Sequence, residues 1–358
     1  MKNSKMGDTK VEKIEKIGGG VTPCESKLIK GMALIMMVYH HFFAWPERVL
    51  IPSAYIDYSF HGTSIVYFIA KACKLCVCIF AFLSGYGLFY SYSSHKENKE
   101  KIQYGIKKMF EMVIVYWSIL FVVILIVGIN KPIGLNELIK NALLIKTTVL
   151  HTAWYVRFYL EAMSVLLIYV VCVNRQVIWK ELFLILLLPC MLYYILPENT
   201  FSHYFPTFML GYIVAKYNLY EKIVLRIGCI KLTMIALALL FALMVIRLKV
   251  GDSIGPLAII TFMSMPLVWV MKVASDYLEK VGIIRKLLMI INTYSTYYWL
   301  LHSIFHCGLS EIQKIVYLPH YPMLIEGWAF ILMTPFVIVI KKCDVCLLGT
   351  LEKRTKEK

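Results

Sequence analysis

A lysine and two histidines stand at the two ends of the first long apolar run: Lys30, His40 and His41. Ionisable side chains are costly in hydrocarbon, so within a membrane helix they indicate function by default. At about 100° per residue, the spacing of Lys30 and His41 brings both to one helix face, about 16 Å apart, whereas His40 points about 80° away. Histidine changes protonation near neutral pH and can act as a general base towards a hydroxyl group. The pair therefore predicts proton-transfer chemistry at His41 and, about three turns away on the same helix face, a cation at Lys30 that can bind a phosphate or carboxylate.

Each of these residues also has an interpretation without chemistry. A lysine at the inner end of a first span often extends to the surface and only fixes topology. His41 could form a hydrogen bond between helices, which is its main alternative. His40 is expected to pack or to form a hydrogen bond.

A second group of polar residues lies in the apolar run 152–173. Arg157 and Glu161 are four residues apart, so a helix brings them together as an ion pair. Trp154 and Tyr159 flank them, and aromatic rings suit either the faces of a sugar or the interfacial belt of a membrane protein. The group is either structural or part of the binding site for the substrates.

His302 and His306 are also spaced to share one helix face, and such a pair can begin a metal site. No glutamate follows the first histidine as in an HExxH motif, and no third ligand is evident. The two cysteine groups, at 73–78 and at 343–346, are expected at opposite ends of the membrane. We therefore expect no metal site, and small apolar roles for the cysteines.

The composition identifies the elements that must position these residues. Of the 358 residues, 59% are hydrophobic and 17% are charged, against about 45–50% and about 25% in soluble domains. These values predict an all-α, polytopic membrane helix bundle. The net charge of +16 does not indicate nucleic-acid binding, because the cations lie between apolar runs instead of forming one stripe.

About ten apolar runs are long enough to cross a membrane. Most of the 38 Lys and Arg residues lie on the side of the N-terminus if there are ten spans, which places both termini in the cytoplasm. The runs are 28–45, 64–92, 110–129, 152–173, 181–196, 203–217, 230–247, 254–273, 287–306 and 323–341.

The chain is expected to form one membrane domain over residues 28–341. A flexible cytoplasmic tail, 1–27, precedes it and a basic cytoplasmic tail, 342–358, follows it. Residues 132–148 read as an amphipathic segment on the membrane surface. The polar stretch 93–109 reads as a solvated cytoplasmic loop, or as a surface that attracts an anionic cosubstrate.

Four motifs in this order resemble the acyltransferase-3 family of integral membrane acyltransferases. Lys30-x10-His41 resembles the Arg/Lys-x10-His signature, with lysine in place of the commoner arginine, and residues 80–88 (FAFLSGYGL) resemble F-F-x-L-S-G-F. Residues 204–212 resemble the F-x-x-G-Y element and residues 294–302 the late S-x-x-x-Y-L-x-H element. Ser84 within the second motif reads as part of a close helix crossing, because no GxSxG elbow surrounds it.

The resemblance implies transfer of an acyl group, most often acetyl from cytoplasmic acetyl-CoA, to a hydroxyl of a cell-surface or lipid-linked glycan. It implies His41 as the essential imidazole, with Lys30 near the cytoplasmic end of the same helix and His302 lining the same cavity as His41. No tightly bound cofactor is expected; acetyl-CoA, or another acyl-CoA, is a cosubstrate. We expect a multi-pass protein of the cell membrane, the plasma membrane of a bacterium. The alternative is a transporter or flippase for a glycan or lipid intermediate, for which the ten spans would serve equally.

Overall fold

The computed structural model describes residues 19–127, 133–173, 178–189, 191, 200–250, 255–307 and 309–356. These residues are mostly helical, and the one sheet among them is a two-stranded antiparallel hairpin of β1 (Ser59–Phe60) and β2 (Thr63–Ser64). The prediction of an all-α fold is therefore confirmed.

Six helical segments in the described residues are long and apolar enough to cross a membrane, which fits a polytopic protein. The segments are Ile65–Ser93, Asn98–Ile126, His151–Cys172, Cys229–Ile246, Ile259–Leu278 and Pro322–Thr350. Of the other expected spans, 28–45 and 203–217 each lie mainly in one helix, 287–306 is divided between two helices, and 181–196 lies partly outside the described residues. The number of ten spans and the cytoplasmic termini stay predictions.

The chain divides into two compact units that alternate along the sequence. Unit 1 comprises residues 1–29, 78–94 and 176–286, and unit 2 comprises residues 30–77, 95–175 and 287–358. Three boundaries between the units fall within helices. These helices are α2 (Pro23–Phe43), α4 (Cys76–Ser93) and α14 (Gly282–Thr293). The expected domain boundaries at 27/28 and 341/342 stay predictions.

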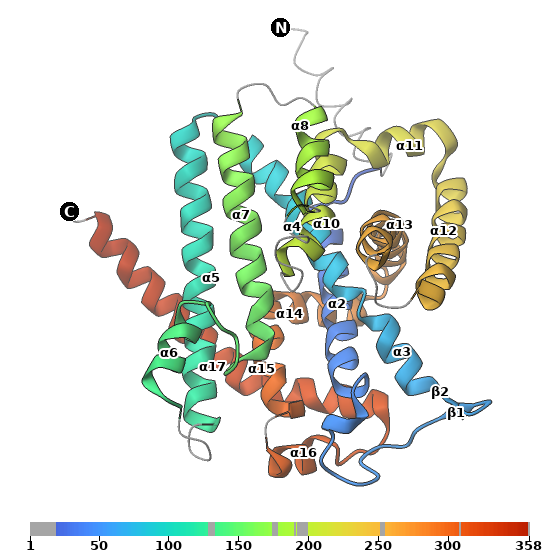
Figure 1. Ribbon diagram of the computed structural model, residues 1–358, viewed down its shortest axis with the longest axis vertical. Helices are drawn as coiled ribbons and strands as arrows, with labels where there is room; N and C mark the ends of the chain where they lie inside the picture. The colour runs from blue at the N-terminus through green and yellow to red at the C-terminus, as the bar shows by residue number, and fades with distance from the viewer. Residues whose placement is uncertain are drawn as a thin grey trace, which may run out of the picture. The chain divides into compact units, whose positions relative to one another are not determined.

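Unit 1 is built from helices that pack side by side, with α12 and α13 the most extensive pair (Figure 1). Helix α10 packs against α13, α11 and η3, and α11 packs against α12. The bounds are α8 (Ile178–Leu182), η3 (Phe183–Leu187), α10 (Thr200–Lys216), α11 (Leu219–Ile227), α12 (Cys229–Val250) and α13 (Gly255–Leu278).

Two glycines let α4 and α10 of unit 1 cross at backbone contact. A Cβ atom on Gly85 would lie 1.8 Å from the carbonyl oxygen of Phe208, and one on Gly211 would lie 2.0 Å from that of Phe82. Small residues permit this approach between helices in a membrane. The expected close crossing at Ser84-Gly85 is therefore confirmed, and the motif around residue 211 supplies its other half.

Buried charges in unit 1 are paired. The ammonium of Lys272 lies 2.9 Å from a carboxylate oxygen of Glu25, and both side chains are buried. Asp276 adds a second carboxylate to Lys272 at 3.4 Å. Lys216 pairs with the fully buried Glu181. Pairing offsets the cost of removing these charges from water.

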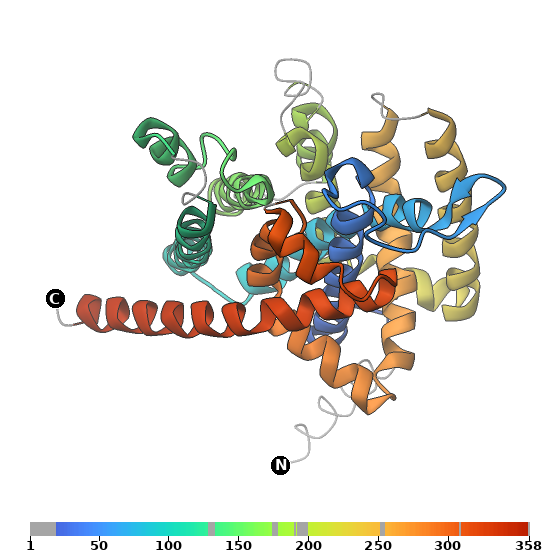
Figure 2. The ribbon, with the colours of Figure 1, turned by 90° about the horizontal axis from the view of Figure 1, so that it is seen from below.

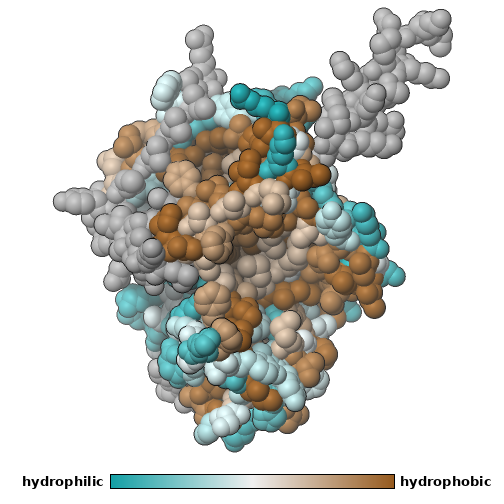
Figure 3. Space-filling view, turned by 90° about the vertical axis from the view of Figure 1, so that its right-hand side faces the viewer, coloured by the Kyte–Doolittle hydropathy of each residue, from teal (hydrophilic) through white to brown (hydrophobic). Residues whose placement is uncertain are grey.

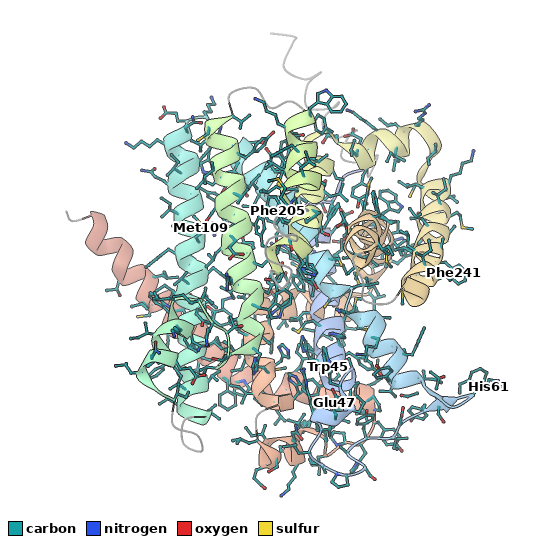
Figure 4. The ribbon with its side chains drawn as sticks, viewed as in Figure 1. Trp45, Glu47, His61, Met109, Phe205 and Phe241 are labelled. Carbon is teal, nitrogen blue, oxygen red and sulfur yellow. The ribbon has the colours of Figure 1, made fainter. Side chains whose placement is uncertain are left out.

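The apolar residues of α12 point outwards. Ile230, Met234 and Phe241 are all largely exposed, and Phe241 projects away from α13 in Figure 4. Brown, hydrophobic side chains also cover much of the face shown in Figure 3. Exposed apolar surface on a long hydrophobic helix is the pattern expected where lipid replaces water.

Unit 2 combines a pair of long helices with a group of helices from the C-terminal part of the chain. Helices α5 and α7 lie side by side, and α15 packs against α5, α16 and α17 (Figure 1). Figure 2 shows α17 as one long, continuous rod. The bounds are α3 (Ile65–Cys73), α5 (Asn98–Val127), α6 (Leu135–Ala142), η2 (His151–Ala153), α7 (Trp154–Cys172), α15 (Ser295–Cys307), α16 (Ser310–Val316) and α17 (Pro322–Lys356).

Three predicted segments differ in detail from the structure. The run 287–306 is not one helix, because the chain turns at Tyr294 between α14 and α15. In the described residues 133–148 of the amphipathic segment 132–148, the one helix is the short α6, and a turn at Leu144 with positive φ follows it. Helix α17 continues through residue 341 as far as Lys356.

Candidate active site

Helix α2 carries Lys30 and His41, and its sequence fixes where it ends. Proline restricts the preceding residue to extended conformations, so the helix stops before Pro46, at Phe43, and a short 3-10 helix, η1 (Pro46–Arg48), follows. Gly31 lets α2 approach α14 closely, since a Cβ there would lie 2.7 Å from the carbonyl oxygen of Leu288. The expected placement of both residues on one helix is confirmed.

Three imidazole rings of unit 2 form a cluster at the end of α2. The ring centroid of His41 lies 4.6 Å from that of His302 and 5.5 Å from that of His306, and the last two are stacked at 5.4 Å. We call His41, His302 and His306 the histidine cluster. His302 and His306 are buried and His41 is partly exposed. The rings of His41 and His302 are thus neighbours, and the prediction that His302 lines the same cavity as His41 stays a prediction.

The hydrogen bonds of the cluster define the state of His302. Its Nδ1 lies within hydrogen-bond distance of the carbonyl oxygen of Trp299. A carbonyl oxygen only accepts, so Nδ1 carries a hydrogen and Nε2 of the neutral ring keeps its lone pair. That Nε2 atom is buried without a hydrogen-bond partner among the described residues, as is Nδ1 of His41. Unpaired buried nitrogens are uncommon and need an explanation.

His40 has a different role from its neighbour. Its Nδ1 donates to the carbonyl oxygen of Ala70 at 2.6 Å, and the side chain is buried. The expectation that His40 forms a structural hydrogen bond is confirmed. The corresponding alternative for His41, a hydrogen bond between helices, finds no support at Nδ1 in the described part of the chain.

Gln313 of α16 connects the cluster to the loop after α2. Its amide nitrogen donates to the carbonyl oxygens of His306 at 2.6 Å and Arg48 at 3.0 Å. Its amide oxygen accepts from the backbone of Leu50 at 2.7 Å. The side chain is fully buried, so these three bonds hold η1 against the end of α15.

Trp45 lies just beyond the end of α2 (Figure 4) and contacts the cluster there. Its ring stacks on His41 at 5.4 Å with an angle of 29° between the planes. Arg48 lies 4.5 Å and Lys71 5.2 Å from the centroid of the same indole ring. We call Trp45, Arg48 and Lys71 the Trp45 platform.

Lys30 stands apart from the cluster along α2. Its side chain is partly buried and forms no hydrogen bond or ion pair within the described ranges. A cation without a partner in an apolar segment is costly and is compatible with a bound anion. The functional role of Lys30 stays a prediction.

Arg157 and Glu161 form the ion pair that their spacing predicts, at 2.9 Å. The pair is partly exposed instead of buried, and Arg157 also donates to the carbonyl oxygen of Ile145 at 3.4 Å. These contacts hold Arg157 to its own helix and to the loop after α6.

The beginning of α7 nevertheless touches the helix that carries His302. Thr152 donates to the carbonyl oxygen of Leu300, and the ring of Tyr155 lies 4.5 Å from that of Trp299. The rings of Trp154 and Tyr155 are in contact at 5.7 Å. Tyr159 lies further along α7. The binding roles of Trp154, Tyr159, Arg157 and Glu161 stay predictions.

The described residues contain no group of three His, Cys, Asp or Glu side chains placed to hold a metal ion.

Sequence reasoning missed Trp45, Arg48 and Gln313 as neighbours of the histidines. Lys71 offered a signal, because it interrupts an apolar run, but its partner Trp45 lies 26 residues away. Glu326 offered a similar signal within the last run; it is buried, and its Oε1 has no partner in the part of the chain described.

The fold and the site together define a multi-pass, helical membrane protein with an imidazole cluster inside one of its two units. A family model described as an acyltransferase domain matches residues 26–341, and the chain belongs to this acyltransferase-3 family. The protein is therefore a membrane acyltransferase. No curated protein and no solved structure matches the chain.

Proposed function

We propose that the protein is an O-acetyltransferase, which transfers an acyl group, acetyl, from cytoplasmic acyl-CoA to a hydroxyl of a cell-surface or lipid-linked glycan in the cell membrane. Membership of the family supports acyl transfer. The donor, the acceptor and the membrane are the proposed parts.

One observation carries the proposal: His41 Nδ1 and His302 Nε2 are both buried and unpartnered in adjacent rings of the described structure. A small rotation of either ring lets a hydrogen on His41 Nδ1 be donated to His302 Nε2. His41 Nε2 then keeps a lone pair for chemistry. A base that is held in one tautomer by a second group is the arrangement that activates acyl-transfer sites.

Two routes use this lone pair. In the general-base route, His41 Nε2 takes the proton of the acceptor hydroxyl as its oxygen attacks the thioester carbon. The carbon–sulfur bond breaks and the proton passes to the CoA sulfur.

In the covalent route, His41 Nε2 attacks the thioester carbon and the CoA thiolate leaves. The Nδ1 proton of His41 moves to His302, so the acylated imidazole is neutral. The acceptor oxygen then attacks the acyl carbon, the carbon–nitrogen bond breaks, and the hydroxyl proton joins the thiolate, while the proton on His302 returns to His41.

The remaining predicted residues bind the substrates in this proposal. Lys30, on the cytoplasmic side, binds an anionic part of CoA, and Arg157 with Glu161 contributes at the edge of the site. Trp154 and Tyr159 contact the acceptor. Two observations support these roles: the cation of Lys30 has no partner in the described residues, and the first residues of α7 contact α15.

The central test uses purified protein in lipid nanodiscs and acetyl-CoA that is labelled in the acetyl group. It measures transfer of the label to glycan extracted from the membrane of the cells that produce the protein. His41→Ala is expected to reduce the rate by about 10³-fold or more. His61→Ala is the matched control, because His61 is an exposed histidine at the tip of the hairpin. Normal transfer by folded His41→Ala protein would contradict the proposal, and glycan movement without label would support a carrier.

The same assay tests Lys30. Lys30→Ala is expected to raise the KM for acetyl-CoA by about 10-fold or more, because a hydrogen bond to a charged group is worth about 1.5–3 kcal/mol. Lys30→Arg retains the charge and most of the activity. The exposed Lys27→Ala is the control. Equal activity of Lys30→Ala and Lys30→Arg would leave Lys30 with a topological role.

A further inference from the structure

Two cations share one indole ring next to the histidine cluster. The guanidinium of Arg48 and the ammonium of Lys71 both lie over Trp45, and Lys71 also lies 5.0 Å from the ring of Tyr67. Cation–π contacts of this kind hold a charged group in place without neutralising it. The chain therefore brings two positive charges together from η1 and α3.

Neither charge has a carboxylate partner in the described ranges. Glu47 is next to Arg48 in sequence and is exposed, but the two form no ion pair there. Asp57, the other carboxylate of this loop, accepts a hydrogen bond from Ser64 instead. Two unpaired cations at one place form a region of positive potential. In unit 1, by contrast, Lys272 and Lys216 each have a carboxylate.

The Trp45 platform is continuous with the reacting imidazole. The indole stacks directly on His41, and the backbone of Arg48 is fixed by Gln313, which also binds the backbone of His306. Trp45 follows His41 along the chain, whereas Lys30 lies about three turns before it. A group bound at the platform is therefore on the opposite side of His41 from Lys30.

We propose that the Trp45 platform binds an anionic group, a phosphate or carboxylate, on the acyl acceptor. The substrate class is thus an acidic sugar or a sugar phosphate. This inference rests on the proposed function, because the side of Lys30 is assigned there to CoA. The planar fork of Arg48 matches the two oxygens of a carboxylate or phosphate, and Lys71 adds a point charge.

Binding of small probes tests the platform without any acyl transfer. The purified full chain in neutral detergent is titrated calorimetrically with glucuronate, with glucose 1-phosphate and with uncharged methyl glucoside. The charged probes are expected to bind about 10-fold more tightly than the neutral one. The variant Arg48→Gln/Lys71→Gln should lose this preference, and Arg48→Lys should retain part of it.

Lys74→Gln is the matched control, because Lys74 lies one turn after Lys71 and has no contact with Trp45 in the described structure. It should keep the full preference. Equal binding of charged and neutral probes by the unaltered protein, no measurable binding of the charged probes, or an unchanged preference in the double variant would each overturn the proposal.

Membrane lipids are another source of phosphate. The titration is therefore repeated in nanodiscs of phosphatidylcholine with and without phosphatidylglycerol. Persistence of the preference in both supports an acceptor site, and its loss with phosphatidylglycerol assigns the cations to lipid headgroups. If transfer of labelled acetyl depends on His41 but shows no preference for acidic sugars, this inference alone is contradicted. If no such transfer occurs, the proposed function is contradicted.

Discussion

The two units of this chain differ in the partners of their buried polar groups. In unit 1, Lys272 has Glu25 and Asp276, and Lys216 has Glu181. In unit 2, the described structure buries the ring nitrogens His41 Nδ1 and His302 Nε2 and the carboxylate oxygen Glu326 Oε1 without a hydrogen-bond partner. An unpaired buried group costs free energy, so it persists where it serves another purpose. Unit 1 therefore reads as scaffold and unit 2 as the place of chemistry.

The family motifs divide along the same line. Gly85 and Gly211 belong to unit 1, where each meets the backbone of the other's helix. Lys30, His41 and His302 belong to unit 2. One set of motif residues is explained by close packing, and the other leaves ionisable groups available. Changes in the first set should alter stability, and changes in the second set should alter the reaction rate.

His302→Asn should give the largest effect that separates these roles. The amide nitrogen of asparagine can replace Nδ1 in donating to Trp299, but nothing replaces Nε2. We expect kcat for acetyl transfer to fall by about 10²-fold or more, with little change in KM or in Tm. The measurement is steady-state kinetics with labelled acetyl-CoA, beside thermal unfolding in the same detergent.

His302→Gln supplies the comparison for this prediction. A glutamine nitrogen or oxygen reaches further than that of asparagine and can occupy the region of Nε2, so partial recovery of kcat is expected. Full activity in His302→Asn would show that the ring only fills space beside His41.

Sequence patterns predicted the features that depend on near neighbours in the chain. The helical fold, the shared face of Lys30 and His41, and the Arg157–Glu161 pair all follow from spacing on a helix. Composition could not locate the turn at Tyr294, because both sides of it are rich in apolar residues.

Contacts between distant segments were beyond prediction. Gln313 binds residues more than 260 positions away, and Lys272 pairs with Glu25, which lies in a distant segment of the chain. The Trp45 platform likewise joins two segments whose charges, taken separately, look like ordinary interfacial lysine and arginine. Only packing decides which of such charges are paired and which are free.

Lys272→Ala should be the strongest change in unit 1. It leaves the Glu25 carboxylate buried without its cation, and breaking a buried ion pair costs about 3–5 kcal/mol. The expected result is a clear fall in Tm and in yield, while transfer per folded molecule stays normal. Lys272→Met combined with Glu25→Gln removes both charges and should recover most of the stability. A loss of kcat without a loss of Tm would contradict the division between the units.

Gly85→Ala and Gly87→Ala form the smallest and most closely matched comparison. Both glycines lie in α4, two residues apart, but an added Cβ meets the Phe208 carbonyl at residue 85 and nothing within 4 Å at residue 87. Overpacking at the crossing should cost about 1–3 kcal/mol, because a backbone atom has to move. Alanine at residue 87 should stabilise the helix by up to about 1 kcal/mol, since glycine is the poorer helix former. Opposite shifts in Tm with unchanged kcat would place this motif in the scaffold. A loss of kcat in Gly85→Ala at normal stability would instead mean that the helix crossing takes part in the reaction. That result would contradict the assignment of unit 1 to the scaffold.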